Sequence, residues 1–288
     1  MTQPRIRTVQ CLSPSGLHRM AYKEWGDPEN PATLVCVHGL TRVSDDFDAL
    51  AAELCGTYRI VCPDVVGRGR SDRLHDPLAY QVPQYVADMV TLIARLNVES
   101  VHWIGTSMGG LIGMLLASLP GSPIRKLLLN DIGPTLNVPA LVRIGEYIGQ
   151  PIRFATLEQG VEYVRQVSLS FGPHTDAQWR KLAADVLRQD ADGQWMFGYD
   201  PALGITMRGM TEQDVRQAEA LLWNAYDAIA CPTLLLRGAE SDLLSRETAQ
   251  AMTQRGPKAA MIEIPGVGHA PTFVDPAQIA IARKFLLA

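Results

Sequence analysis

Residues 100–119 read SVHWIGTSMGGLIGMLLASL and contain the pattern that decides the fold. Residues 100–105 form a short apolar run that predicts a buried strand, and residues 109–119 predict a buried helix. Between them lies GTSMG at 105–109, a GxSxG pentapeptide. A serine in a tight strand-to-helix turn takes strained backbone angles, and side chains in place of the two glycines would collide with neighbouring elements. We therefore predict that Ser107 is a nucleophile held at a sharp turn.

The alternation of short apolar runs and helical segments continues on both sides of this turn. A helix is expected over residues 82–96, where apolar side chains recur at helical spacing. Near-continuous apolar strands separated by helices indicate a mostly parallel central sheet flanked by helices on both faces. Weaker patterns near residues 6–10 and 17–23 predict antiparallel strands at one edge. The further parallel strands are expected over residues 33–37, 58–62, 126–130, 233–237 and 260–264.

A long segment without a clear parallel strand follows the strand that ends near residue 130. A structureless loop of that length is unlikely in a compact domain. Its apolar pattern is helical instead, over residues 138–148, 157–171, 175–189 and 211–222. Because ligands bind at the carboxyl ends of parallel strands, we predict that residues 134–224 form a helical cap, or lid, over the site. Residues 1–133 and 225–288 then form the core that carries the sheet.

A serine hydroxyl is a weak nucleophile unless a neighbouring base takes its proton. His269 is the best candidate, because it follows the last strand in the glycine-containing loop GVGHA at 266–270. His102 lies within a predicted strand, where packing or hydrogen bonding is the expected role. Three other histidines lie in polar segments and are expected to face solvent: His18, His75 and His174.

The base in turn needs a carboxylate that fixes its tautomer and stabilises the imidazolium. Asp242, after the strand over residues 233–237, is the preferred candidate, and Glu240 nearby is the weaker choice. Asp131 also follows a strand, and its alternative interpretation is a turn residue where the chain leaves for the insertion. We predict Asp242 as the acid and keep Asp131 as the alternative.

The developing oxyanion needs donors that are in place before the reaction. One is expected to be the backbone N–H of Met108, because the first N–H groups of a helix have no partner within it. The other is expected to be the Leu40 N–H, in the loop HGLT at 38–41, where Gly39 lets the backbone approach the site. His38 is expected to be a structural histidine that is hydrogen-bonded to the backbone.

The composition narrows the classes of partner and compartment. The 288 residues carry a formal net charge of -4, and the basic residues are scattered, which argues against nucleic-acid binding. LIGMLLASL at 111–119 is much shorter than the roughly 20 apolar residues of a membrane-spanning helix. The five cysteines include Cys36 and Cys62 within strand-like runs, which favours buried free thiols, and no cluster has metal-ligand spacing. We expect a soluble, cytoplasmic enzyme without cofactor, metal or membrane contact, and leave open whether it forms a homo-oligomer.

Five motifs together resemble the α/β-hydrolase superfamily, in its serine carboxylesterase-like branch with a helical cap. They are VCVHGL (35–40), PDVVGRGRSD (63–72), IGTSMGG (104–110), LLLRGAESD (234–242) and GVGHAP (266–271). The resemblance implies the α/β-hydrolase fold and the chain order of nucleophile, acid and base that Ser107, Asp242 and His269 satisfy. It also implies that the loop at 64–72 is structural.

The function that follows is cleavage of carboxylic esters of small molecules through an acyl-enzyme. One alternative is a lactonase or a carbon–carbon bond hydrolase of aromatic catabolism, and a non-enzymatic alternative is a hydrolase-fold ligand receptor. Arg143 and Arg208 in the cap are each candidates either for binding a substrate carboxylate or for a surface role. The cap aromatics either line the substrate pocket or pack the cap on the core: Phe171, Trp179, Trp195, Phe197, Tyr199 and Trp223.

Overall fold

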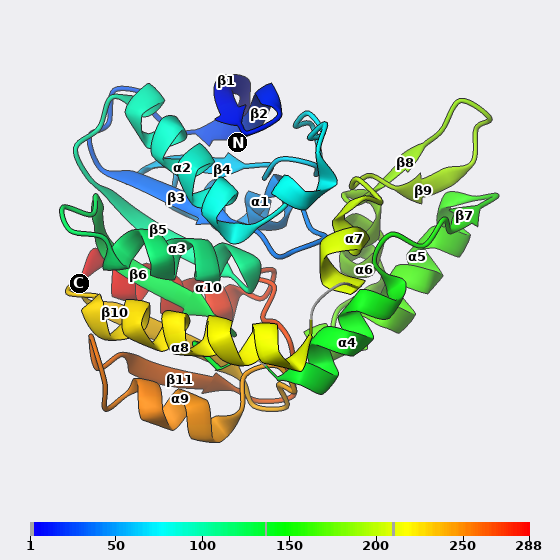
Figure 1. Cartoon of the computed structure of the whole chain (residues 1–288). Coiled ribbons are helices and arrows are strands. Elements are labelled where there is room, and N and C mark those ends of the chain that lie inside the picture. Colours follow the sequence, from blue (N-terminus) through cyan, green and yellow to red (C-terminus); the bar gives the residue numbers. More distant parts are fainter. Residues whose placement is uncertain (1–2, 136, 209–210) are drawn as a thin grey trace.

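An eight-stranded sheet forms the centre of the computed structural model, which describes residues 3–135, 137–208 and 211–288 (Figure 1). The strand order is β1-β2-β4-β3-β5-β6-β10-β11. β1 pairs antiparallel with β2, and β2 with β4, whereas all later neighbours run parallel. The strands are β1 (Arg5–Ser13), β2 (Gly16–Trp25), β3 (Thr33–Val37), β4 (Arg59–Pro63), β5 (Val101–Thr106), β6 (Ile124–Asn130), β10 (Thr233–Gly238) and β11 (Ala260–Ile264).

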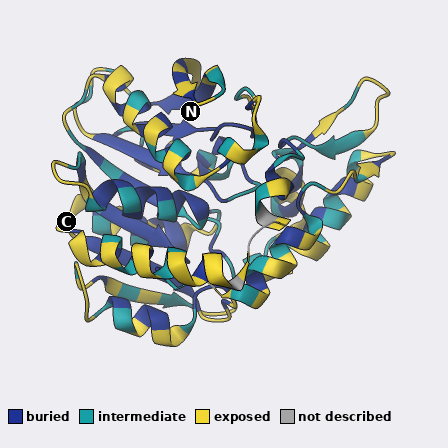
Figure 2. Cartoon of the chain, in the orientation of Figure 1, coloured by how far each residue is buried: buried dark blue, intermediate teal, exposed yellow. Residues whose placement is uncertain are grey.

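Helices cover both faces of this sheet, and its inner strands β3, β4, β5, β6 and β10 are mostly buried (Figure 2). One apolar cluster joins the sheet to α2, α3, α8 and α9, and a second cluster joins the other face to α1 and α10. The mostly parallel sheet with helices on both faces, predicted from the apolar runs, is confirmed. The helices of the core are α1 (Asp48–Leu54), α2 (Val82–Leu96), α3 (Met108–Ser118), α8 (Glu212–Ala228), α9 (Arg246–Met252) and α10 (Pro276–Leu287).

A group of smaller elements between β6 and α8 projects beyond the carboxyl edge of the sheet (Figure 1). We call them the cap elements, and they include a three-stranded antiparallel sheet ordered β7-β9-β8. They share a small apolar core, with Phe154, Val164 and Leu187 buried in it. The cap elements are α4 (Val138–Tyr147), β7 (Arg153–Phe154), α5 (Leu157–Val167), α6 (Asp176–Ala184), β8 (Leu187–Gln189), β9 (Trp195–Phe197) and α7 (Leu203–Arg208).

Two features of this region differ from the sequence-based expectation. The predicted helix over 175–189 ends at Ala184, and residues 187–189 form a strand instead, because a turn with a left-handed Gly193 folds them back on β9. The expected boundary at residue 224 falls inside α8, and α8 packs on core helix α3. The part of the insertion that lies outside the core therefore ends before α8.

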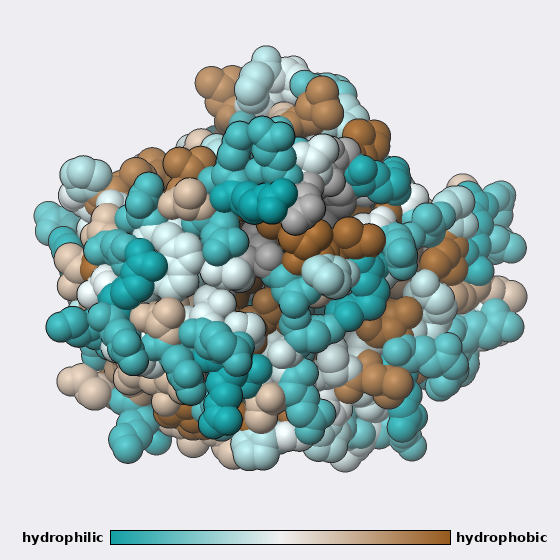
Figure 3. Space-filling view, turned by 60° about the horizontal axis from the view of Figure 1, so that its bottom comes forward, coloured by the Kyte–Doolittle hydropathy of each residue, from teal (hydrophilic) through white to brown (hydrophobic). Residues whose placement is uncertain are grey.

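The outer surface alternates polar side chains with smaller apolar patches, as the face in Figure 3 shows. Within the described ranges, the structure contains no helix whose length and apolar character would let it cross a membrane. None of the five cysteines, all of which the structure describes, forms a disulfide, and Cys36 and Cys62 are buried, as their place in apolar strands predicted.

The junction of β5 and α3 explains both glycines of the GxSxG pattern. A Cβ at position 105 would lie 2.2 Å from the carbonyl oxygen of Gly109, and a Cβ at position 109 would lie 2.0 Å from the carbonyl oxygen of Val37. Both contacts are with backbone, which cannot rotate away as a side chain can. The helix α3 therefore rests directly on strands β3 and β5, and the residue at the turn is held in one position.

We expect the substitution Gly109→Ala to lower the free energy of unfolding by about 2–3 kcal/mol, the usual cost of overpacking. Gly56→Ala is the matched control, because a Cβ at Gly56 meets no atom within 4 Å, and its effect should stay within about 0.5 kcal/mol. Denaturant titration followed by circular dichroism measures both. Equal stability of the two variants would contradict the close contact of α3 with β3.

Candidate active site

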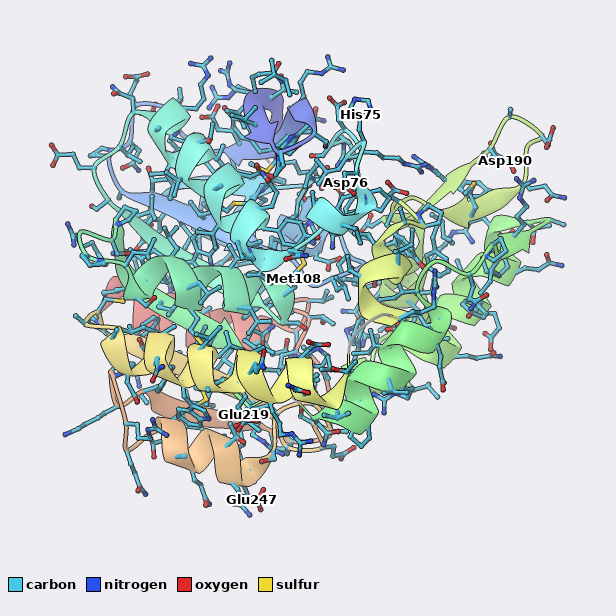
Figure 4. All side chains as sticks on the ribbon, in the orientation of Figure 1. His75, Asp76, Met108, Asp190, Glu219 and Glu247 are labelled. Carbon is cyan, nitrogen blue, oxygen red and sulfur yellow. The ribbon has the colours of Figure 1, made fainter. Side chains whose placement is uncertain are left out.

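Ser107 occupies the turn between β5 and α3 with a positive φ of 51° and a ψ of -116°. A non-glycine residue in this region is strained, and such strain persists only where the surroundings hold it. Here the Ser107 N–H donates to the Asn130 carbonyl (3.0 Å), and its carbonyl accepts from Gly110 and Leu111 at the start of α3. The side chain consequently stands at the end of the sheet that faces the cap elements, where Figure 4 labels the next residue, Met108.

The structure brings the side chains of Ser107 and His269 together. The Ser107 Oγ lies 2.9 Å from His269 Nε2, and His269 Nδ1 lies 2.8 Å from Asp131 Oδ2. Because a carboxylate can only accept, the proton of the imidazole is on Nδ1, and Nε2 is free to accept from the serine. Ser107, His269 and Asp131 thus form a hydrogen-bonded triad with the arrangement that nucleophilic catalysis by serine requires.

Asp131, not Asp242, is the carboxylate next to His269. It is fully buried and follows β6 directly, with a φ of 54° that turns its side chain toward the end of β10. There it also accepts from the Gly238 N–H (2.9 Å) and the Ser241 hydroxyl (2.6 Å). These donors satisfy the carboxylate oxygens inside the protein and hold the carboxylate beside His269 Nδ1.

The expectation that Asp242 orients His269 is corrected by this geometry. Asp242 lies beyond the turn that Ser241 makes after β10, its side chain is 45% exposed, and its carboxylate pairs with Arg143. Glu240 is also exposed. The sequence places both Asp131 and Asp242 after strands, but only the order of strands in the sheet puts β6 beside β5, which carries the nucleophile.

Two further serines support the base, and sequence reasoning did not single them out. Ser241 holds Asp131, as described. Ser170, from the cap side, donates its hydroxyl to the His269 carbonyl (2.7 Å), and its own carbonyl accepts from the Gly268 N–H (2.6 Å). A serine in a polar loop has no signal in the sequence that distinguishes such a role.

The loop after β3 lies against the nucleophile, as expected for a donor of the oxyanion hole. A Cβ at Gly39 would come within 3.8 Å of the Ser107 Cβ, so the Leu40 backbone runs close to the site. His38 is buried and structural, as predicted: its Nε2 accepts from the Val65 N–H (3.0 Å), and its Nδ1 donates to the Gly39 carbonyl (2.7 Å). Burial lowers the pKa of His38, which keeps the imidazole neutral in this role.

A cavity of about 140 Å³ opens beside Ser107 and His269, between the core and the cap elements. Its lining mixes apolar and polar side chains, with Ile144, Val164 and Phe171 among the apolar ones. Of the cap aromatics named in the sequence, Phe171, Phe197 and Tyr199 line this cavity. Trp179 stacks on Phe171, and Trp223 packs on Arg255 and donates to Thr135, so these two support the structure rather than the pocket.

Two arginines line the cavity, and they differ in how their charges are used. Arg42 is buried, pairs with Asp46 and donates to the Leu182 carbonyl. Arg143, on α4, is 58% exposed and pairs with Asp242 at the rim. Arg208 lies elsewhere in the cap and donates to the Ile148 carbonyl.

The histidines expected to face solvent behave differently from one another. His75 is exposed, as predicted, but His18 is buried with its Nε2 3.0 Å from Asp88. The prediction for His18 was wrong because β1 and β2 lie against α2, a contact between segments far apart in the chain. His174 is partly buried and bonds to Thr272.

Cys11, His18 and Asp88 form the group of metal-ligating type found within the described ranges. Burial raises the pKa of the Cys11 thiol to about 12, so in the metal-free protein the thiol is protonated at neutral pH. His18 Nε2 lies 3.0 Å from the Asp88 carboxylate within this group.

A model of the alpha/beta hydrolase family matches residues 34–282. The chain belongs to the alpha/beta hydrolase family. A structure of a hydrolase from Rickettsia typhi superposes with a TM-score of 0.89 at 30% identity, covering 98% of this chain and 99% of the other. An alpha/beta hydrolase from Novosphingobium aromaticivorans gives 0.87 at 35% identity, covering 100% and 99%.

A curated relative adds the reaction class. The 3-hydroxybutyrate-oligomer hydrolase of Cupriavidus necator is 60% identical over 98% of this chain and 97% of its own length. The units of such an oligomer are joined by ester bonds. The chain is a carboxylic ester hydrolase, which removes the receptor alternative.

We expect Asp131→Asn to lower kcat of this hydrolase by about 10⁴-fold, because the amide would stabilise the wrong tautomer of the base. Asp242→Asn should keep kcat within about twofold, since Asp242 makes no contact with His269. The comparison is made with a neutral chromogenic short-chain ester. A severe loss in the Asp242 variant together with a mild one in the Asp131 variant would reverse the geometric assignment.

Proposed function

We propose that this protein hydrolyses the ester bonds of short 3-hydroxybutyrate oligomers through an acyl-enzyme on Ser107. The observation that carries the proposal is the 60% identity, over nearly the whole of both chains, with the oligomer hydrolase of Cupriavidus necator. The hydrogen-bonded triad of Ser107, His269 and Asp131 supports the acyl-enzyme mechanism.

The chemistry proceeds in two half-reactions. Ser107 Oγ attacks the ester carbonyl while His269 Nε2 takes its proton, and the oxyanion is bound by the Leu40 and Met108 N–H groups. The tetrahedral intermediate collapses, and His269 returns the proton to the leaving hydroxyl of the adjacent unit. A water molecule, deprotonated by His269, then attacks the acyl-enzyme and releases the acid, which restores the Ser107 hydroxyl.

The cavity suits a substrate of this kind. Each unit of the oligomer is a short methyl-branched chain, and the lining by Ile144, Val164 and Phe171 offers apolar contact. About 140 Å³ is small beside the roughly 300–1,000 Å³ of pockets that enclose drug-sized ligands. This favours an acyl group of one short unit over a long acyl chain.

The charge at the rim suits the end of the substrate. An oligomer of 3-hydroxybutyrate carries a carboxylate at one terminus, and Arg143 is the cavity-lining arginine whose side chain is accessible. An arginine binds a carboxylate with charge-assisted hydrogen bonds. We assign the terminal carboxylate of the leaving unit to Arg143, which shares its charge with Asp242 until the substrate arrives.

Ser107→Ala should abolish hydrolysis of the 3-hydroxybutyrate dimer, measured by release of the monomer. The wild-type protein should cleave the dimer with a higher kcat/KM than it cleaves a simple enol-lactone or a vinylogous diketone. Absence of dimer cleavage by the folded wild type would refute the proposed substrate, and full activity of the alanine variant would refute the proposed nucleophile.

Arg143→Gln should raise KM for the dimer by about tenfold, the loss of one charge-assisted bond at a partly exposed site. KM for the methyl ester of the dimer, which lacks the terminal charge, should change by less than about twofold. Arg208→Gln is the matched control, because it removes the same charge from the cap outside the cavity lining. Equal changes for the acid and the methyl ester would refute the role of Arg143.

A further inference from the structure

Arg68, in the loop after β4, is fully buried. Its Nε donates to the Leu40 carbonyl (2.8 Å), and its Nη2 lies 3.4 Å from the Met108 sulfur. Leu40 and Met108 are the two residues whose N–H groups are assigned to the oxyanion hole. One side chain therefore spans both halves of the hole, which come from distant parts of the chain.

The remaining contacts of Arg68 are also with neutral groups. Its Nη1 donates to the Val66 carbonyl (2.7 Å) and lies 3.1 Å from the Tyr85 hydroxyl. The guanidinium carbon lies 4.9 Å from the centre of the Tyr85 ring and 5.9 Å from that of Tyr80. Rings and carbonyls orient the cation by their partial negative charges without neutralising it.

Among the described residues, no carboxylate lies within ion-pair distance of Arg68, although the other well-buried arginines have one. Arg42 pairs with Asp46 and Arg237 with Glu263, and the partly buried Arg59 pairs with Glu24. Taking a charge out of water without a counter-charge is costly. If the role of Arg68 were only to hold two loops together, neutral side chains could do so at less cost.

We infer that Arg68 is a positioning residue for the oxyanion hole: it holds the Leu40 carbonyl and the Met108 side chain, and it places a positive charge that has no ion-pair partner among the described residues beside the two residues of the hole. The negative charge on the substrate oxygen is small in the ground state and large in the tetrahedral transition state. A fixed cation in a water-excluded environment therefore stabilises the transition state more than the bound substrate. This inference rests on the proposed acyl-enzyme mechanism but not on the identity of the ester.

The test uses Arg68→Met, which keeps most of the side-chain volume, and a neutral chromogenic ester. The variant should lose 10- to 100-fold in kcat with less than a threefold change in KM. Inhibition by a trifluoromethyl ketone, which forms a tetrahedral oxyanion adduct with serine, should weaken by the same factor as kcat/KM. Inhibition by an ether analogue of the ester, which resembles only the ground state, should change less than threefold.

Arg59→Met is the control, because the Arg59 side chain is only 12% exposed but pairs with Glu24 on β2, away from the site. It should be destabilised with kcat of the folded protein unchanged. If the Arg68→Met variant does not fold, the Arg68→Lys variant is used for the same measurements. Lysine keeps the charge but cannot reach Leu40 and Met108 together, so kcat should fall by about three- to tenfold, again with ketone inhibition weakened in parallel.

The inference is overturned if the folded Arg68 variants keep wild-type kcat, or if ketone and ether inhibition weaken equally. Failure of the ketone to inhibit the wild type would overturn the acyl-enzyme mechanism and this inference together. The two failures are thus distinguishable, because the first leaves ketone inhibition of the wild type intact.

Discussion

The contact of Gly109 with the Val37 carbonyl is the constraint on which the site depends. It seats α3 on β3 and β5 so closely that a single methyl group would not fit. The turn before the helix is then forced to a positive φ at Ser107, and the start of α3 lies against the end of β3 and the residue after it. The nucleophile and one oxyanion donor are therefore placed by backbone packing, without the need for side chains that could relax.

The other catalytic groups reach the nucleophile because neighbouring parallel strands end at the same edge. β5 carries Ser107, β6 carries Asp131, and the loop after β11 carries His269. Two further close approaches hold this loop: a Cβ at Gly238 would lie 2.1 Å from the Gly268 carbonyl oxygen, and Ser170 bonds to the loop from the cap. The buried Asp131 carboxylate accepts hydrogen bonds from His269, Gly238 and Ser241. The triad is therefore held in place before substrate binds.

The charges around the site fall into two kinds, and burial separates them. Arg143 and Asp242 are half-exposed at the rim, where water screens them and a substrate carboxylate can join the pair. Arg68 is fully enclosed by rings and carbonyls, so water screens its charge little. We thus assign recognition of the substrate carboxylate to Arg143 in the cap, and stabilisation of the transition state to Arg68 in the core.

The sequence by itself determined most of the strands and helices of the core, and two residues of the triad, Ser107 and His269. Apolar periodicity and the glycines of GTSMG are local signals, and they placed the strands, the turn at Ser107 and the loop of His269 close to where they lie. Only the tertiary structure decided the acid, because Asp131 and Asp242 both follow strands and differ in which strand lies beside β5. The burial of His18, the strands within the cap and the contacts of Arg68 were decided in the same way. Each depends on contacts between segments that are far apart in the chain. A local sequence pattern does not show which distant segment a residue will contact.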